Sequence, residues 1–157
     1  MKKILFVGLL ICATDLVAQH GQVDTLKYCL DEDLVGLGGF DPISYFKLNK
    51  PVEGNEDINA QFENVTYYFS SKSNKKLFLA SPETYLPQFG GWCSMNLAMG
   101  QATTPTYSNF MVKNNKLYLF ERTLSVDGRE VWRQDPKQNE KLASANYNQY
   151  RHTGKIK

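Results

Sequence analysis

Two stretches of the chain carry the pattern of a β-hairpin, and they constrain the fold more than any other feature. In AQFENVTYYFSS (60–71), β-favouring residues lie on both sides of Glu63-Asn64. In TTPTYSNFMVKNNKLYLFER (103–122), the turn is expected at Asn114-Asn115, because asparagine tolerates the left-handed backbone conformation of tight turns. The strands and helices follow no βαβ rhythm, which favours an α+β class over a parallel α/β sheet.

Short helices are expected between the two hairpins. Ser71 or Ser73 can cap a helix that runs through Ala80, since serine hydroxyls accept hydrogen bonds from the first backbone N–H groups of a helix. Pro82 occupies an allowed first-turn position of a second short helix. A third helix should follow the GGWC sequence and end near Met99.

The end of the chain reads as a polar helix from about residue 136 to 150. The residues expected to face inward on it are Leu142, Ala145 and Tyr150. With 157 residues and 42% hydrophobic residues, the chain is long enough to bury a core of its own. We therefore predict a small single α+β domain, in which two β-hairpins pack against short helices and a C-terminal helix.

The N-terminus has the pattern of a secretory signal peptide. Lys2 and Lys3 precede the apolar run ILFVGLLICA, and small residues allow cleavage after Ala18. The run is too short to be a good transmembrane helix. We therefore expect an exported protein, periplasmic or secreted, with no integral membrane segment after cleavage. The expected divisions are a signal peptide (1–18), a polar N-terminal lead-in (19–35), a globular domain (36–150) and a basic tail (151–157).

The charge balance gives no reason to expect nucleic acid as a partner. The formal net charge of +2 falls to +1 when Lys2, Lys3 and Asp15 leave with the signal peptide. Proteins that bind nucleic acid through its phosphates carry a marked excess of basic residues. The partners we expect are therefore a metal ion or another exported protein.

The order of several motifs resembles the YHS-domain family in its exported single-domain form. The resemblance covers roughly residues 36–150, and it implies a small α+β domain related to cysteine-rich metal-binding modules. No single motif is specific to this family, but the order and spacing of the motifs are. The motifs are GFDPISYF (39–46), KPVEG (50–54), YYFSSKSNKKLF (67–78), SPETYLPQFGGWC (81–93) and NKLYLF (115–120).

Metal-binding members of that family carry cysteine at three positions where this chain does not. The resemblance places those positions at Ser44, Ser70 and Asn74. Serine is a poor ligand for zinc or copper beside thiolate or imidazole. The family's metal site is therefore not expected here, and Ser70 is expected to end a strand and to help start the following helix.

Cys93 remains as the candidate ligand for a soft metal ion, copper or zinc. Met95 and Met99 follow it, and thioethers suit Cu(I). The three sulfur atoms converge only if the helix begins after Cys93, because residues two and six positions on otherwise lie on other faces. Our first hypothesis is thus a non-catalytic binding protein that handles a soft metal ion through Cys93.

Three further alternatives stay open. Cys29 and Cys93 can form a disulfide in an oxidising compartment, which would make the protein a structural or interaction module. A thiol enzyme that uses Cys93 is a weaker alternative, since no histidine lies near it in the sequence. The aromatic residues either form a core or line a ligand pocket, for which the candidates are Tyr45, Tyr68 and Trp92.

Overall fold

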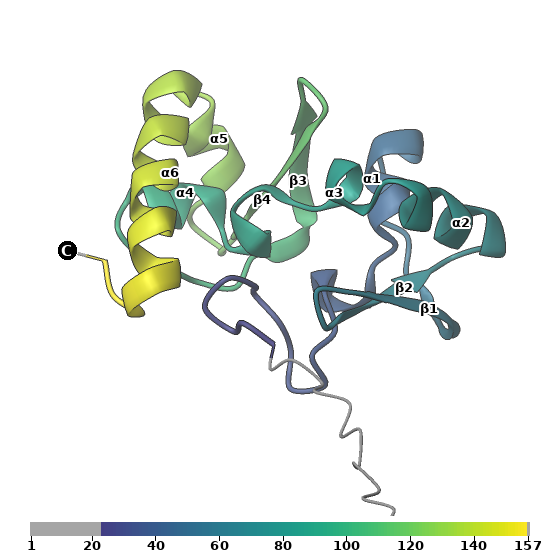
Figure 1. The fold of residues 1–157 in the computed structure, drawn as a ribbon. Helices are drawn as coiled ribbons and strands as arrows, with labels where there is room; N and C mark the ends of the chain where they lie inside the picture. The colour runs from purple at the N-terminus through teal and green to yellow at the C-terminus, as the bar shows by residue number, and fades with distance from the viewer. Residues whose placement is uncertain (1–22, 157) are drawn as a thin grey trace, which may run out of the picture.

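The protein has two antiparallel hairpins, and the second of them lies between two groups of helices (Figure 1). The computed structural model describes residues 23–156, so the predicted signal peptide lies outside the described residues. The α+β class predicted from the sequence is confirmed, because both sheets are two-stranded and antiparallel. In chain order the elements are η1 (Leu37–Gly39), α1 (Pro42–Leu48), β1 (Asn55–Phe62), β2 (Val65–Phe69), α2 (Lys72–Ala80), α3 (Pro82–Tyr85), η2 (Gln88–Gly91), α4 (Ser94–Ala98), β3 (Thr106–Lys113), β4 (Lys116–Phe120), α5 (Gly128–Trp132) and α6 (Pro136–Thr153).

Both hairpin turns fall where the sequence predicts them. Glu63 and Asn64 join β1 to β2 with φ angles of 49° and 64°. Asn114 and Asn115 join β3 to β4 with φ angles of 53° and 58°. Two successive positive φ angles match the right-handed twist of the flanking strands, which is why such two-residue turns favour asparagine.

The predicted helix starts are also confirmed. Ser71 caps α2, because its Oγ accepts the backbone N–H of Asn74 at 3.1 Å. Pro82 occupies the first turn of α3, where a missing N–H costs no helical hydrogen bond. Asp135 caps α6 by accepting the backbone N–H of Gln138 at 3.1 Å.

The buried face of α6 differs from the prediction. Leu142 is 40% exposed and Ala145 is exposed, whereas Ala143 is fully buried. Polar contacts orient the helix: Asn146 Nδ2 donates to the carbonyl oxygen of Leu97 at 2.7 Å. The small side chain of Ala143 then faces the core beside α4. Its size lets the two helices pack closely, and Leu142 is left at the surface.

The end of α6 lies further along the chain than expected. The helix continues to Thr153 and is capped by Gly154, which has a φ of 68° and donates its N–H to the carbonyl oxygen of Tyr150 at 2.7 Å. Ile156 packs against the core cluster around α4 and α6. The predicted basic tail is therefore helical in its first three residues and packed near its end.

The N-terminal lead-in is packed into the domain. Tyr28 and Cys29 are buried, and the Cys29 N–H donates to the carbonyl oxygen of Gly90 at 3.0 Å. Val35 is also buried and forms an isolated parallel bridge with Thr66 of β2. In Figure 1 this segment, drawn in purple, runs below both groups of helices. Its described part is therefore a component of the fold.

Strand β4 lies between two parts of the core. On one face, Tyr118 and Phe120 belong to the cluster formed with α4, α5 and α6. On the other face, Leu117 and Leu119 belong to a cluster with α1 and β3. A third cluster lies between the first hairpin and α2. Side chains alternate along a strand, so β4 is buried on both faces.

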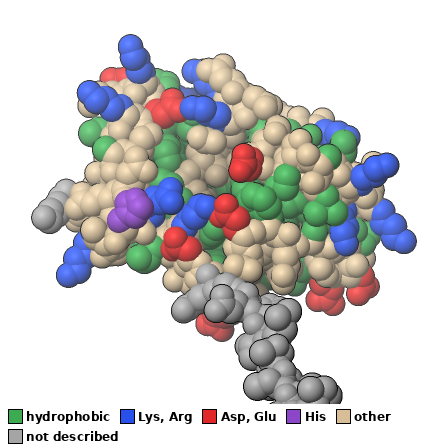
Figure 2. All heavy atoms as spheres, in the orientation of Figure 1, with side chains coloured by type: hydrophobic (Ala, Val, Ile, Leu, Met, Phe, Trp, Pro, Cys, Tyr) green, Lys and Arg blue, Asp and Glu red, His purple; other side chains and the backbone are tan. Residues whose placement is uncertain are grey.

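The surface carries charges of both signs. On the face drawn in Figure 2, Lys, Arg, Asp and Glu side chains are interspersed, and hydrophobic side chains reach the surface between them. Within residues 23–156, no helix is both long and apolar enough to cross a membrane.

Candidate functional site

Cys93 serves as the N-cap of α4. Its Sγ accepts the backbone N–H groups of Asn96 at 3.5 Å and of Glu121 at 3.1 Å. The side chain is fully buried, and burial raises the pKa of the thiol. The sulfur therefore sits in the core as a neutral hydrogen-bond acceptor that joins α4 to the end of β4.

The two candidate methionines lie in different environments. Helix α4 begins at Ser94, after Cys93, which meets the condition for convergence of the three sulfur atoms. Met95 is buried in the same cluster as Cys93, but Met99 is the C-cap of the helix and is 59% exposed. The part of the chain that the structure describes holds no group of three His, Cys, Asp or Glu side chains placed to bind a metal ion.

Cys29 and Cys93 are both buried free thiols. The Cys29 thiol donates to Thr104 Oγ1 at 3.7 Å, and burial raises its pKa. The structure thus gives each cysteine its own polar partner and places neither in a disulfide.

A thiol assay on the chain from Gln19 onward, which lacks Cys12, tests this arrangement. We expect two thiols in denaturant, the full reduced mass, and much slower reaction with a thiol reagent in the native protein than glutathione shows. The physical reason is that only an accessible thiolate is a good nucleophile, and both thiols are buried with raised pKa values. A mass two hydrogens lower, with no thiol released in denaturant, would instead show a Cys29–Cys93 disulfide.

The three candidate pocket aromatics lie in separate places. Tyr45 is fully buried in the cluster with α1, and its hydroxyl donates to the carbonyl oxygen of Tyr107 at 3.1 Å. Trp92 packs edge-on against Tyr150, with ring centroids 5.4 Å apart. Tyr68 lies on β2 beside Gly39. These three side chains do not line one pocket.

The three positions at which the family resemblance places cysteine do come together, around a buried aspartate. Asp41 Oδ2 accepts the N–H of Ser70 at 2.9 Å, the hydroxyl of Ser70 at 2.6 Å and Asn74 Nδ2 at 2.7 Å. Its Oδ1 accepts the N–H of Ile43 at 2.9 Å, which caps α1. The hydroxyl of Ser44 donates to the Asp41 carbonyl oxygen at 2.7 Å. Each of these donors has an acceptor, so the cluster fastens α1 to β2 and α2.

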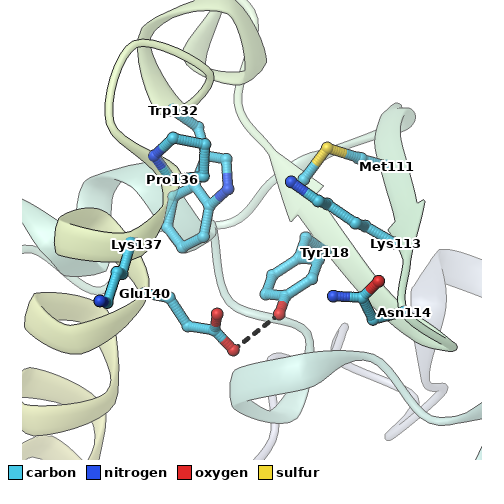
Figure 3. Close-up of a pocket in the computed structure, with 8 residues that line it drawn as sticks. All are labelled: Met111, Lys113, Asn114, Tyr118, Trp132, Pro136, Lys137 and Glu140. Carbon is cyan, nitrogen blue, oxygen red and sulfur yellow. Dashed lines mark hydrogen bonds between the residues drawn. The ribbon is translucent and has the colours of Figure 1, made fainter.

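A pocket lies between the second hairpin and the helices α5 and α6, and some of its polar groups have no hydrogen-bond partner among residues 23–156 (Figure 3). We call it the Trp132 pocket; its volume is about 160 Å³. That size matches an engineered cavity that accepts a benzene-sized molecule. It is lined by Met111, Lys113, Asn114, Tyr118, Trp132, Pro136, Lys137 and Glu140.

Glu140 of α6 provides the negative charge of the Trp132 pocket. Its Oε1 accepts the hydroxyl of Tyr118 at 2.8 Å and the ammonium of Lys116 at 2.7 Å. The hydrogen bond from Lys116 is the largest cause of the lowered pKa of Glu140, and the bond from Tyr118 adds to it. The carboxylate is therefore charged, and in Figure 3 its second oxygen points into the pocket.

Trp132 provides a hydrogen-bond donor on the opposite side. The ring as a whole is only 1% exposed, but its indole nitrogen faces the pocket, and no protein acceptor for the N–H is found among residues 23–156. Figure 3 shows the indole nitrogen on the ring edge turned toward Met111 and Lys113, and the Lys113 ammonium reaching across the mouth of the pocket. The lining therefore combines a positive charge, a free N–H and a free carboxylate oxygen around apolar walls.

Little in the sequence points to this site. Lys113 and Tyr118 belong to the second hairpin, whereas Trp132 and Glu140 come from α5 and α6. The one usable signal is that Glu140 lies in the first part of a polar helix that follows a lone tryptophan.

Comparison of the chain with protein-family models, with curated proteins and with solved structures finds no match in any of the three.

Proposed function

We propose that this chain is an exported, non-catalytic binding protein and that the Trp132 pocket holds a small zwitterion of the size of a free amino acid. The observation that carries the proposal is the convergence of three groups on one cavity: the unpaired indole N–H of Trp132, the ammonium of Lys113 and the free carboxylate oxygen of Glu140. The indole N–H faces the open pocket and has no protein acceptor there, so a ligand acceptor would take the place of water and form a hydrogen bond beside apolar walls.

The chemistry of the lining decides the class of ligand. A ligand carboxylate would accept hydrogen bonds from Trp132 and Lys113, and its ammonium would donate to Glu140. Met111 and the ring of Tyr118 leave room for a short apolar body. A pocket of about 160 Å³ fits a small molecule and holds no more than a part of a large cofactor.

The same groups are poorly suited to catalysis, which supports a binding role. A carboxylate with a lowered pKa is a weak general base, and Glu140 has one. Cys93 is buried and its pKa is raised, so it lacks the thiolate that a thiol enzyme requires.

For Cys93 we propose a scaffold role in place of metal handling. Its sulfur already accepts two backbone N–H groups, while Met99 lies exposed at the far end of α4. A soft metal ion would have to displace both hydrogen bonds and recruit ligands that the fold does not assemble around Cys93.

Tryptophan fluorescence tests the proposed ligand class. The chain has two tryptophans, so Trp92→Phe leaves Trp132 as the only reporter. We expect L-alanine to shift the emission of Trp132, and to bind at least about tenfold more tightly than isobutyrate or isopropylamine, which each lack one of its two charges. Lys113→Met and Glu140→Gln should each weaken the binding of alanine by about tenfold or more.

The matched control is Lys141→Met, which removes the same charge from α6 outside the Trp132 pocket and should leave binding unchanged. Larger aliphatic amino acids extend the panel to the limit of the cavity. The proposal fails if no zwitterion in the panel perturbs Trp132, or if isobutyrate binds as tightly as alanine, because Glu140 would then have no role.

A further inference from the structure

A second cavity lies where the N-terminal segment, the turn between β1 and β2, the loop before α4 and helix α6 meet. Its volume is about 230 Å³. Residues 86–90 of the LPQFGG sequence form one wall of it. The other side chains that matter here are four aromatic rings and two carboxylates, from Tyr28, Phe62, Phe89, Tyr147, Glu63 and Glu83.

The aromatic rings form walls at an angle to one another. Phe89 and Tyr147 are 5.8 Å apart between centroids and cross at 65°. Phe89 has a φ of 56°, a conformation that non-glycine residues rarely adopt, and it borders the cavity with a mostly buried ring that packs between Tyr118 and Tyr147. Crossed aromatic faces around a cavity are the surface on which organic cations bind, because each ring face carries partial negative charge.

Two carboxylates add full negative charge at the same cavity. Glu63 Oε2 accepts the ammonium of Lys27 and the hydroxyl of Tyr28, and the hydrogen bond from Lys27 is the largest cause of the lowered pKa of Glu63. Glu83 is exposed and forms no salt bridge with residues 23–156. One carboxylate is thus partly neutralised, and the other is free.

Cationic side chains of the protein already lie over the faces of two of these rings. Lys27 Nζ lies 4.9 Å from the ring centroid of Tyr28, and the guanidinium carbon of Arg151 lies 5.9 Å from that of Tyr147. Both distances are within the range of a cation–π interaction. The rings of this surface thus already attract cationic groups of the protein. In the part of the chain that the structure describes, no cation lies over Phe62 or Phe89, and none pairs with Glu83.

We propose that this cavity is a binding site for an organic cation, a primary ammonium on a short apolar body. The ammonium lies between Glu63 and Glu83, and the body packs against Phe62 and Phe89. Lys27 is the internal competitor, since it pairs with the same Glu63 that the ligand requires. The site is separate from the Trp132 pocket, with which it shares no lining residue.

The test is an NMR titration of the protein with n-butylammonium, and with 1-butanol as the neutral probe of equal length. We expect butylammonium to shift the amide signals of Glu63 and Gly90, and butanol to leave them nearly unchanged. Lys27→Met frees Glu63 and should tighten the binding of butylammonium by up to about fivefold. Glu83→Gln should weaken it by a similar factor. Lys27→Met keeps the backbone carbonyl that accepts the Tyr147 hydroxyl at 2.9 Å.

Controls separate this site from general charge effects and from the other pocket. Glu32→Gln removes an exposed carboxylate of the N-terminal segment that does not line the cavity, and it should change nothing. Equal shifts with butanol and butylammonium would overturn the proposal, because the cavity would then be merely apolar. Shifts confined to the Trp132 indole signal would also overturn it, while leaving a ligand in the Trp132 pocket.

Discussion

Replacing Gly90 with alanine should strongly destabilise this protein. A Cβ at this position would lie 1.7 Å from the carbonyl oxygen of Lys27 and 3.0 Å from the hydroxyl of Tyr147. The neighbour that would have to move is backbone, and that backbone is held by hydrogen bonds on both sides. The Tyr147 hydroxyl donates to the Lys27 carbonyl oxygen at 2.9 Å, and the Cys29 N–H donates to Gly90 at 3.0 Å. We expect a loss of at least about 4 kcal/mol in the free energy of unfolding, at the top of the range for single substitutions.

Gly100→Ala is the matched control for that experiment. Gly100 also has a positive φ, 85°, but a Cβ there meets only Ile156 Cγ2 at an ordinary 3.7 Å. This variant should therefore show only the cost of a left-handed alanine, about 1–2 kcal/mol. Urea denaturation followed by circular dichroism measures both. Equal losses of unfolding free energy in the two variants would contradict this prediction. They would mean that the backbone around Lys27 moves aside without cost, so that the close approach at Gly90 does not matter for stability.

Removal of the Asp41 carboxylate is the second substitution with a large expected effect. Asp41→Ala leaves the N–H of Ile43, the N–H and hydroxyl of Ser70, and the amide of Asn74 without their acceptor in a buried site. Hydrogen bonds to a charged acceptor contribute more than neutral ones, and buried donors that lose their partner are costly. We expect a loss of about 3–5 kcal/mol in the free energy of unfolding.

Two further variants show whether the acceptor role of Asp41 causes that loss. Asp41→Asn keeps the shape but replaces one acceptor oxygen by a donor, so it should fall between the wild type and Asp41→Ala. Asp57→Ala removes an exposed carboxylate of β1 and should change the stability by no more than about 0.5 kcal/mol. A loss at Asp41 as small as that at Asp57 would show that water replaces the carboxylate without cost.

Features set by neighbouring residues could be predicted from the sequence. The Asn114-Asn115 turn, the Ser71 cap and the Pro82 helix start each depend on a few adjacent positions, whose backbone preferences are strong. The face of α6 could not be predicted, because contacts to α4 and to the N-terminal segment orient that helix. Ala143 is buried in place of Leu142 for that reason.

The candidate site could not be predicted for the same physical reason. Trp132 and Glu140 meet Tyr118 only after the second hairpin has packed on α5 and α6. The Asp41 cluster likewise joins residues up to 33 positions apart. The family resemblance named three of its members, Ser44, Ser70 and Asn74, as positions of interest. It gave no sign that an aspartate would hold them together.

The double burial of β4 has a consequence for how the molecule behaves as a whole. Tyr118 and Phe120 fill one side of the core while Leu117 and Leu119 fill another, so a single five-residue strand is the common wall of both. If the helices on one side detach, the strand exposes an apolar face to water. The free-energy cost of that exposure destabilises the half that is still folded. The two halves drawn in Figure 1 are therefore poor candidates for separation into independent fragments. Any evolutionary or engineered change of one half must preserve the strand on which the other depends.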